Sequence, residues 1–383
     1  MTADQIARDR RALLAVATQF FINGAVVASY VPRLPGIRDR LGIDLGTIGI
    51  VIAVATAGGV FGSAAVSRAI DRFGTKRVMM GGALALVGLL PVVGFVTTWL
   101  QLLLVLALIA ASDVMTDVAM NLQGSALSAR RSTPVMNRLH AMWSLGTVVG
   151  GLIAAAMAGL EVSLRLHLIV AALVLLVGLL YVVPGLLTED DVPEEDDSVV
   201  GERRGAKLVW LFGLLGAAAI VPEMINSDWA AFRLTDDLDA SDGVAGLAYV
   251  AFTSGMVTGR LFGDTVVERL GSNVMLRLAT VVAAVGVAAA TLIPVVASVF
   301  VGLFIAGLGV SVMFPQLYDA AAKSPQSAAA LGGLTAGSRI ALLAAPAIVG
   351  ALANTATFTV GSAIALVTIP AAVAVLVLTP SSN

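Results

Sequence analysis

The chain has 383 residues, of which 58% are hydrophobic and 13% are charged, and its mean hydropathy is +0.95. Soluble domains are about half apolar and about a quarter charged, so this composition excludes a water-soluble protein. The net charge is −2, with no long basic tract, which excludes a nucleic-acid partner. The chain contains no cysteine, which excludes disulfides and thiolate metal sites.

Twelve apolar segments follow one another along the chain, and each is long enough to cross a bilayer as a helix, which takes about 20 residues. Arg8, Arg10 and Arg11 precede the first segment as in a signal peptide, but that segment is too long for one and eleven more follow, so we expect an uncleaved first span. The segments are 12–35, 45–70, 76–98, 100–128, 135–159, 164–187, 208–235, 243–267, 273–295, 297–323, 327–353 and 358–379.

A charged stretch at 188–207 divides the segments six and six, and we interpret it as a solvated cytoplasmic linker. The predicted domains are an N-terminal six-helix bundle at 1–187 and a C-terminal six-helix bundle at 208–383. Placing both termini in the cytoplasm puts most of the 23 Lys and Arg residues on the inner side. The sequence therefore predicts a multi-pass protein of the plasma (inner) membrane, and we expect a monomer.

An internal repeat supports two equivalent halves. The segment GSAAVSRAIDRFG at 62–74 aligns with GRLFGDTVVERLG at 259–271, and both end an even-numbered helix at the predicted cytoplasmic face. The alignment pairs Gly62 with Gly259, Asp71 with Glu268, Arg72 with Arg269 and Gly74 with Gly271. Many secondary transporters are built from repeated halves that rock around a site near the middle of the membrane.

At these residues the chain resembles the major facilitator superfamily, whose loop between helices 2 and 3 carries a Gly-x-x-x-Asp-Arg-x-Gly-x-Arg/Lys signature. Ser67 stands where the family usually has its first glycine. The resemblance implies an all-α membrane fold with 12 transmembrane helices in two pseudo-symmetric six-helix bundles. It also implies that the loop residues latch the cytoplasmic side during gating. These gating residues are Asp71, Arg72, Gly74 and Arg77 (or Lys76), with Glu268, Arg269 and Gly271 in the second copy.

Four further motifs resemble the fucose-permease-like branch of this superfamily, which holds many uncharacterised bacterial permeases. They are DVAMNLQG (117–124), NRLHAMWSLG (137–146), SDWAAF (227–232) and GRLFGD (259–264). This resemblance implies a sugar-like solute. Efflux antiporters carry a Gly-Pro signature in helix 5, whereas GTVVGGLIAAAMAG at 146–159 has no proline, which argues against drug export.

Three polar residues recur one turn apart in the fourth span: Asp113, Asp117 and Asn121. At this spacing they lie on one helix face and can point into a common cavity. Two carboxylates one turn apart in a low-dielectric site disfavour double ionisation, so one of them can carry a proton. We interpret Asp113 or Asp117 as the carrier of a coupling proton and Asn121 as a substrate ligand; a polar packing seam is the alternative.

The seventh span contains a second polar group beside Pro222, which predicts a kink. Glu223 is a candidate for proton coupling, and Asn226, Asp228 and Trp229 are candidates for substrate binding. Because Asp228 lies about 140° around the helix from Glu223, the two acids are not expected to serve one site. Incidental polar residues at a proline kink are the alternative.

Arg339 is the one basic residue that the predicted spans place near a helix centre, and an unpaired guanidinium there would be untenable. We expect a pair with Glu223 or with a helix 4 aspartate; a bidentate contact with an anionic group of the substrate is the alternative. His140, about five residues into the fifth span, is a candidate for proton release, because its ordinary pKa is near neutral, or else a structural histidine.

Aromatic and amide side chains complete the candidate substrate site, with Asn23, Trp143 and Gln316 as its further members. The sequence has no phosphate-binding Gly-x-x-x-x-Gly-Lys-Ser/Thr loop and no recognisable nucleophile or metal set. We therefore expect no enzyme activity, no cofactor and no metal. The other side chains expected to line a cavity are Phe20, Phe21, Tyr30, Tyr249, Phe314 and Tyr318.

The sequence thus predicts a secondary active transporter that imports a small polar solute together with protons. Its expected partners are that solute, protons and the lipid bilayer. Proton/solute antiport that exports drugs or metabolites is the second hypothesis. A membrane sensor without transport is a third, from a different class.

Overall fold

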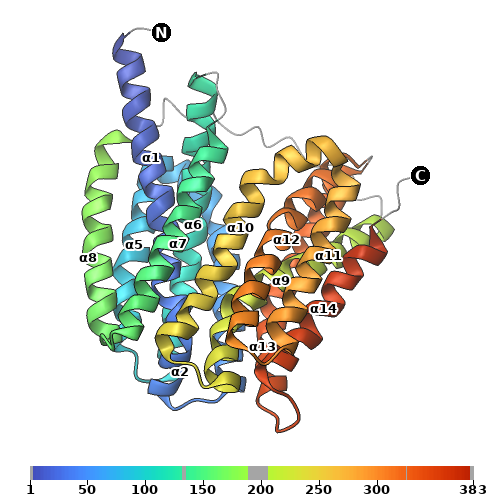
Figure 1. The fold of residues 1–383 in the computed structure, drawn as a ribbon. Helices are drawn as coiled ribbons and strands as arrows, with labels where there is room; N and C mark the ends of the chain where they lie inside the picture. Colours follow the sequence, from blue (N-terminus) through green and yellow to red (C-terminus); the bar gives the residue numbers. More distant parts are fainter. Residues whose placement is uncertain (1–2, 132–134, 189–205, 325, 380–383) are drawn as a thin grey trace. The chain divides into compact units, whose positions relative to one another are not determined.

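A computed structural model describes residues 3–131, 135–188, 206–324 and 326–379, and its regular elements are all helical (Figure 1). The first part of the chain contains α1 (Ala3–Tyr30), η1 (Val31–Arg33), α2 (Leu34–Leu41), α3 (Leu45–Ala55), α4 (Ala57–Phe73), α5 (Thr75–Phe95), α6 (Trp99–Arg131), α7 (Met136–Gly159), α8 (Leu164–Val182) and η2 (Val183–Gly185). The second part contains α9 (Ala206–Leu238), α10 (Asp242–Leu270), α11 (Ser272–Leu292), α12 (Val296–Ala322), α13 (Ser327–Ala353) and α14 (Val360–Leu378).

Within these residues, 11 helices are long and apolar enough to cross a membrane. The remaining predicted span, the eighth at 243–267, coincides with α10, which is 29 residues long but does not meet the same criterion of apolar composition. Its sequence includes Arg260 and Asp264 and ends with Glu268 and Arg269. The multi-pass membrane fold predicted from the sequence is therefore confirmed, and α10 is a long helix at the position of the remaining predicted span.

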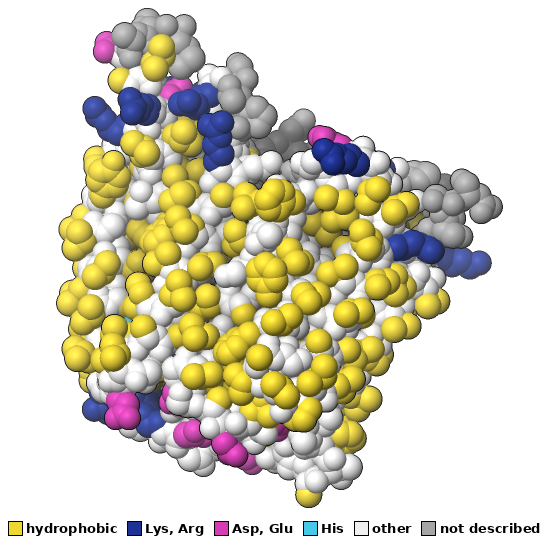
Figure 2. All heavy atoms as spheres, viewed as in Figure 1, with side chains coloured by type: hydrophobic (Ala, Val, Ile, Leu, Met, Phe, Trp, Pro, Cys, Tyr) yellow, Lys and Arg dark blue, Asp and Glu magenta, His cyan; other side chains and the backbone are white. Residues whose placement is uncertain are grey.

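Hydrophobic side chains cover the flanks of the helices, as expected for surfaces in contact with lipid (Figure 2). On the face shown, Lys, Arg, Asp and Glu side chains gather near helix ends. Large apolar side chains that remain exposed include Leu180 of α8, Phe262 of α10 and Val377 of α14. In water such a surface would aggregate, whereas in a bilayer it is the ordinary exterior of a helix bundle.

The chain packs into two compact units. The described residues of Met1–Arg33 and Val54–Glu195 form unit 1, and those of Leu34–Ala53 and Asp196–Asn383 form unit 2. Leu34–Ala53 therefore packs with unit 2, although it lies within 1–187, the predicted N-terminal bundle. The predicted linker at 188–207 falls almost entirely outside the described residues.

Specific contacts hold Leu34–Ala53 in unit 2. The Arg38 guanidinium donates to the Asp236 carboxylate of α9 at 2.5 Å and lies over the Phe232 ring. Gly49 of α3 approaches α13 so closely that a Cβ there would lie 2.7 Å from the Pro346 carbonyl oxygen. The segment is thus fixed both by a charged contact and by close helix packing.

The repeated loop has the same backbone in both units. Gly74 (φ +77°, ψ 156°) follows α4, and Gly271 (φ +80°, ψ 154°) follows α10. Each glycine donates its N–H to the carbonyl four residues earlier, of Ile70 and Val267 respectively. A positive φ at a helix end is the conformation that favours glycine. The alignment made from the sequence therefore reflects a real structural repeat.

Close helix crossings are repeated as well. A Cβ on any of four glycines would fall within 2.6 Å of a carbonyl oxygen of the facing helix, so only glycine fits. In unit 1 these crossings join α4 to α6, and in unit 2 they join α10 to α12. The matching contacts are Gly58 with Ala107, Gly62 with Ala111, Gly255 with Phe304 and Gly259 with Leu308.

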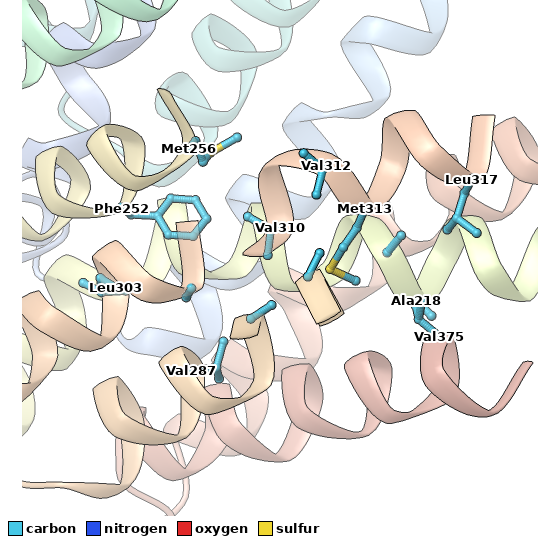
Figure 3. Packing of buried hydrophobic residues seen from close by; sticks show 14 of the residues in the cluster. Ala218, Phe252, Met256, Val287, Leu303, Val310, Val312, Met313, Leu317 and Val375 are labelled. Carbon is cyan, nitrogen blue, oxygen red and sulfur yellow. The ribbon is translucent and has the colours of Figure 1, made fainter. Parts of the chain in front are cut away.

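The interior of unit 2 is an apolar cluster built from α9 to α14 (Figure 3). Phe252 and Met256 of α10 and Val310 and Met313 of α12 point into this cluster. In a membrane protein, dispersion contacts between well-packed side chains stabilise such a cluster.

Candidate functional site

A hydrogen-bonded polar group lies in unit 1, where three helices each contribute one side chain. Asn23 of α1 donates its amide Nδ2–H to Asp113 Oδ1 of α6 at 2.8 Å. The same amide accepts, through Oδ1, the indole N–H of Trp143 of α7 at 2.9 Å. Asn23 is only 3% exposed, while Asp113 and Trp143 are half-buried. The sequence named all three residues but did not connect them.

Asp117 and Asn121 form the next turn of the same helix. The Asn121 amide donates to the Asp117 backbone carbonyl at 2.8 Å and to its carboxylate at 3.1 Å. Asp117 is also the charged neighbour that acts on Asp113. The face of α6 predicted from the spacing is therefore present, and both of its acids hydrogen-bond to neutral amides.

Unit 1 fixes this group by a tight crossing of α1 and α7. A Cβ on Gly24 would lie 2.2 Å from the Trp143 carbonyl oxygen, and a Cβ on Gly146 would lie 2.1 Å from that of Phe21. His140 lies one turn before Trp143 on α7, where it is exposed and meets the Phe20 ring edge to face with centroids 5.2 Å apart. His140 is therefore near the acidic group without belonging to its hydrogen-bonded core.

Gln19 is a residue that the sequence reasoning missed. Its side chain is fully buried on α1, one turn before Asn23, and neither amide atom has a hydrogen-bond partner in the described part of the chain. A buried amide without partners is destabilising by a few kcal/mol, and a polar ligand or a water molecule would relieve this. The signal available in the sequence was a second amide at i and i+4 in an otherwise apolar helix.

In unit 2 the acid beside Pro222 of α9 has a cation that the sequence did not assign to it. Glu223 of α9 lies 3.6 Å from the guanidinium of Arg260 of α10, and both side chains are partly exposed. The sequence placed Arg260 with the cytoplasmic residues and expected Glu223 or a helix 4 aspartate beside Arg339. Arg339 itself is half-buried on α13.

Other polar residues of α9 turn toward their own helix. The buried Asn226 donates its amide to the Pro222 carbonyl at 2.7 Å, so it satisfies backbone at the proline. Ser227 donates to Asp228 at 3.3 Å, and Asp228 is an electrostatic neighbour of the buried Tyr249 of α10. The sequence did not anticipate this second contact between α9 and α10.

Trp229 and Gln316 were both predicted to contact substrate. Trp229 is fully buried, and its indole lies beside Gly49 of α3 and Gly350 of α13. Gln316 of α12 is half-buried, and its Oε1 is a buried atom without a partner among the described residues. Trp229 thus occupies a packed helix junction, and its indole Nε1, like Gln316 Oε1, is a buried atom without a hydrogen-bond partner among the described residues.

The predicted gating residues lie at the helix ends in both units. Asp71, Arg72, Glu268 and Arg269 are exposed, and neither acid forms an ion pair with another described residue. Arg77 donates to the Phe73 carbonyl at 3.3 Å. In the part of the chain that is described, no cluster of three His, Asp or Glu residues could hold a metal ion.

The unit 1 group has no polar counterpart in unit 2, although the backbone around it is repeated. The crossing of Gly24 with Trp143 matches that of Gly216 with Leu334, so Asn23, which precedes Gly24, corresponds to Leu215. The contact of Gly62 with Ala111 matches that of Gly259 with Leu308, so Asp113, two residues after Ala111, corresponds to Val310. The three counterparts Leu215, Val310 and Leu334 belong to the apolar cluster of unit 2.

Three proteins of similar sequence are named as membrane proteins or transporters. The chain is 28% identical over 313 residues to the membrane protein MosC of Rhizobium meliloti, covering 81% of this chain and 75% of MosC. It is 26% identical over 344 residues to the uncharacterized transporter y4wD of Sinorhizobium fredii, covering 89% of this chain and 91% of that protein. A Yersinia pestis protein described as an uncharacterized MFS-type transporter is 26% identical over 337 residues, covering 88% of this chain and 87% of that protein.

Solved structures share the fold at low identity. A mutant of the nucleoside transporter NupG superposes with a TM-score of 0.75 at 15% identity, covering 96% of this chain and 98% of that one. A bacterial homologue of the lysosomal transporter Spinster superposes with a TM-score of 0.67 at 18% identity, covering 96% of this chain and 93% of that one. The family model described as Major Facilitator Superfamily matches residues 16–224. The chain therefore belongs to the major facilitator superfamily and is a multi-pass membrane transporter.

Proposed function

We propose that this transporter imports a small polar solute together with protons by alternating access, with Asp113 as the proton acceptor. The observation that carries the proposal is the setting of Asp113 within α6, where its partners are the neutral amide of Asn23 and the like-charged Asp117. An ionised carboxylate at such a depth is expensive unless a cation or a proton neutralises it. Two adjacent acids favour uptake of a proton by one of them.

The proposed solute is polar and sugar-like. In unit 1, Asn121 supplies a side-chain amide of the kind that binds hydroxyl groups. The branch resemblance implies a sugar-like cargo, and the fold is shared with a nucleoside transporter, NupG; nucleosides contain a sugar. Sugars and nucleosides are therefore the first solutes to test. We place the protein in the plasma membrane as a monomer with both termini in the cytoplasm.

Purified protein in liposomes tests this proposal. An acidic outside solution should drive accumulation of the labelled sugar or nucleoside identified by a thermal-shift screen. Asp113→Asn should abolish uphill accumulation while counterflow exchange of the same solute continues, because exchange needs no net proton movement. Asp319→Asn, which changes an exposed acid of α12, is the matched control and should behave as the wild type.

Three outcomes would contradict the proposal. Full uphill uptake in both Asp113→Asn and Asp117→Asn would remove these acids from proton coupling. Accumulation driven by acid on the inside would favour antiport. Ligand binding with no flux under any gradient would favour a sensor.

A further inference from the structure

The bond between Trp143 and Asn23 has a direction that the indole imposes. An indole nitrogen can only donate a hydrogen bond, so the atom of Asn23 that faces Trp143 must be the amide oxygen. The amide nitrogen then necessarily faces Asp113, and it can only donate. The chain of donors runs from Trp143 through Asn23 to Asp113.

Burial makes this orientation difficult to reverse. Asn23 is 3% exposed, so water does not replace either partner. A turned amide would set its N–H against the indole N–H and its oxygen against the carboxylate, so both polar ends of the buried Asn23 amide would be mismatched. The crossing of α1 and α7 at Gly24 and Gly146 keeps Trp143 in reach of the amide.

We infer that Trp143 is a positioning residue for the proton acceptor: acting through the Asn23 amide, it keeps Asp113 Oδ1 a hydrogen-bond acceptor and directs the coupling proton to Oδ2. This inference rests on the proposed function. The proton comes from the aqueous solution and forms one O–H bond at Oδ2, and no other covalent bond changes. A donated N–H···O bond stabilises the carboxylate more than the acid, so the locked amide also favours release of the proton.

Few other groups act on Asp113. Asp117 lies one turn along α6, and His140 lies one turn before Trp143 on α7. The helices α4 and α5 approach α6 beside Asp113 through glycines, Gly62 at Ala111 and Gly82 at Ser112 and Thr116. Among the described residues, Asn23 therefore donates the hydrogen bond to Asp113, and Trp143 determines the orientation of the Asn23 amide.

The repeat shows that helix packing does not require this network. At the corresponding positions unit 2 carries Leu215, Val310 and Leu334, and the same crossings form around them. Val310 points into the apolar cluster of that unit (Figure 3). A purely structural role would therefore be served equally well by apolar side chains, which makes such substitutions in unit 1 informative rather than simply disruptive.

The experiment measures protonation of Asp113 without a solute. Infrared spectra of the purified full chain in lipid nanodiscs are recorded over a pH series, and the carbonyl band of a protonated carboxyl is assigned to Asp113 by its loss in Asp113→Asn. Trp143→Phe removes the N–H but keeps an aromatic ring, so the amide is free to turn and accept from the protonated acid. We expect the midpoint of the Asp113 band to move upward by about 1 pH unit.

Three further variants complete the test. Trp99→Phe, an exposed tryptophan at the start of α6, should leave the midpoint where the wild type has it. Trp143→Leu copies the unit 2 sequence, should fold, and should shift the midpoint in the same direction as Trp143→Phe. In an Asn23→Leu background the further change Trp143→Phe should have no effect on the midpoint, because the amide that connects them is gone.

The outcomes separate the two proposals. If Asp113 titrates in the wild type and Trp143→Phe has the same midpoint, the positioning role is overturned while proton coupling stands. If the wild type shows no carboxyl band that Asp113→Asn removes, Asp113 is not the proton acceptor and both proposals fall. A shift that persists unchanged in the Asn23→Leu background would also overturn the inference.

Discussion

Asp44 lies between α2 and α3, outside the membrane spans, and its carboxylate accepts the backbone N–H of Thr47 at 2.6 Å. This bond caps the start of α3, and the Thr47 backbone and hydroxyl together lower the pKa of Asp44 below its ordinary value of 3.8. Because the pKa of Asp44 is lower in the folded state than in the unfolded state, the charged cap stabilises the folded protein fully above the pKa of the unfolded state. This stabilisation is lost as the pH falls through the pKa of the folded state.

Substitution at Asp44 should show this pH dependence. Asp44→Ala should lower the stability of the purified protein by about 1 kcal/mol near neutral pH, as loss of a helix cap does. Below about pH 4 the difference from the wild type should shrink, since the wild-type carboxyl is then neutral. Thermal unfolding in detergent across this pH range measures both effects.

Asp44→Asn is the informative control. An asparagine oxygen can still accept the Thr47 N–H but does not titrate, so its advantage over Asp44→Ala should persist at every pH. A wild-type protein whose advantage over Asp44→Ala is the same at pH 3 and pH 7 would show that the charge of Asp44 is irrelevant to the cap.

At this scale the sequence revealed residue types better than partners. The spacing of Asp113, Asp117 and Asn121 was sufficient to predict one polar face of α6. The pairing of Glu223 with Arg260 was missed, because the sequence does not show which helices cross one another. The long side chain of an arginine can also reach a residue at a different level of the neighbouring helix. Gln19 was missed for a related reason, since only the packing shows that its side-chain amide is buried.

Helix crossings depend on glycines that differ sharply in their surroundings. A Cβ on Gly58 would lie 1.9 Å from the Ala107 carbonyl oxygen, and one on Gly255 would lie 2.1 Å from that of Phe304. Gly88, in the interior of α5, has no atom within 4 Å of the same position. All three glycines lie in helices, so an alanine substitution differs among them only in the atoms that its methyl group would contact.

Alanine substitutions should separate these sites. Gly58→Ala and Gly255→Ala should each destabilise the protein by about 1–3 kcal/mol, because the facing helix must move away. Gly88→Ala should be neutral or stabilising by up to about 1 kcal/mol, because alanine is the better helix former. Thermal unfolding of the three variants in one detergent decides the matter, and equal midpoints for Gly58→Ala and Gly88→Ala would contradict the crossing geometry.

Element boundaries followed the sequence where turn residues were distinctive. Gly74 and Gly271 end α4 and α10 as the aligned repeat implies. The second predicted span, 45–70, is interrupted at Thr56, between α3 and α4, and the first predicted span, 12–35, includes η1 and the start of the short helix α2. Hydropathy cannot register such breaks, because the residues on both sides remain apolar.

The boundaries of the two units along the chain were the feature that the sequence predicted least well. Hydropathy and the charged linker predict halves at 1–187 and 208–383, whereas Leu34–Ala53 packs with α9 and α13 in unit 2. No periodicity marks this segment, since its attachment depends on the Arg38–Asp236 pair and on close contacts with α13 at Gly49 and Gly350, which only the fold brings together. The segment therefore ties the first part of the chain to the second.

This tie can be tested by cutting the chain inside 188–207 and co-expressing the two pieces with an affinity tag on the second. The pieces should co-purify in mild detergent. The charge reversal Arg38→Asp should lower the fraction recovered, because the buried part of Arg38 is matched to Asp236, and the single change Asp236→Arg should do the same. The double exchange, Arg38→Asp with Asp236→Arg, should restore recovery.

A matched exchange of an exposed pair separates this contact from a general effect of charge. Asp319 and Lys323 lie one turn apart on α12, with side chains 46% and 71% exposed, so reversing them should leave recovery unchanged. Because the Arg38 side chain is only 11% exposed, its partner cannot be replaced readily by water. Single reversals that co-purify as well as the wild type would mean that Leu34–Ala53 is held by helix packing around Gly49 alone, and Gly49→Leu would then be the change that separates the pieces.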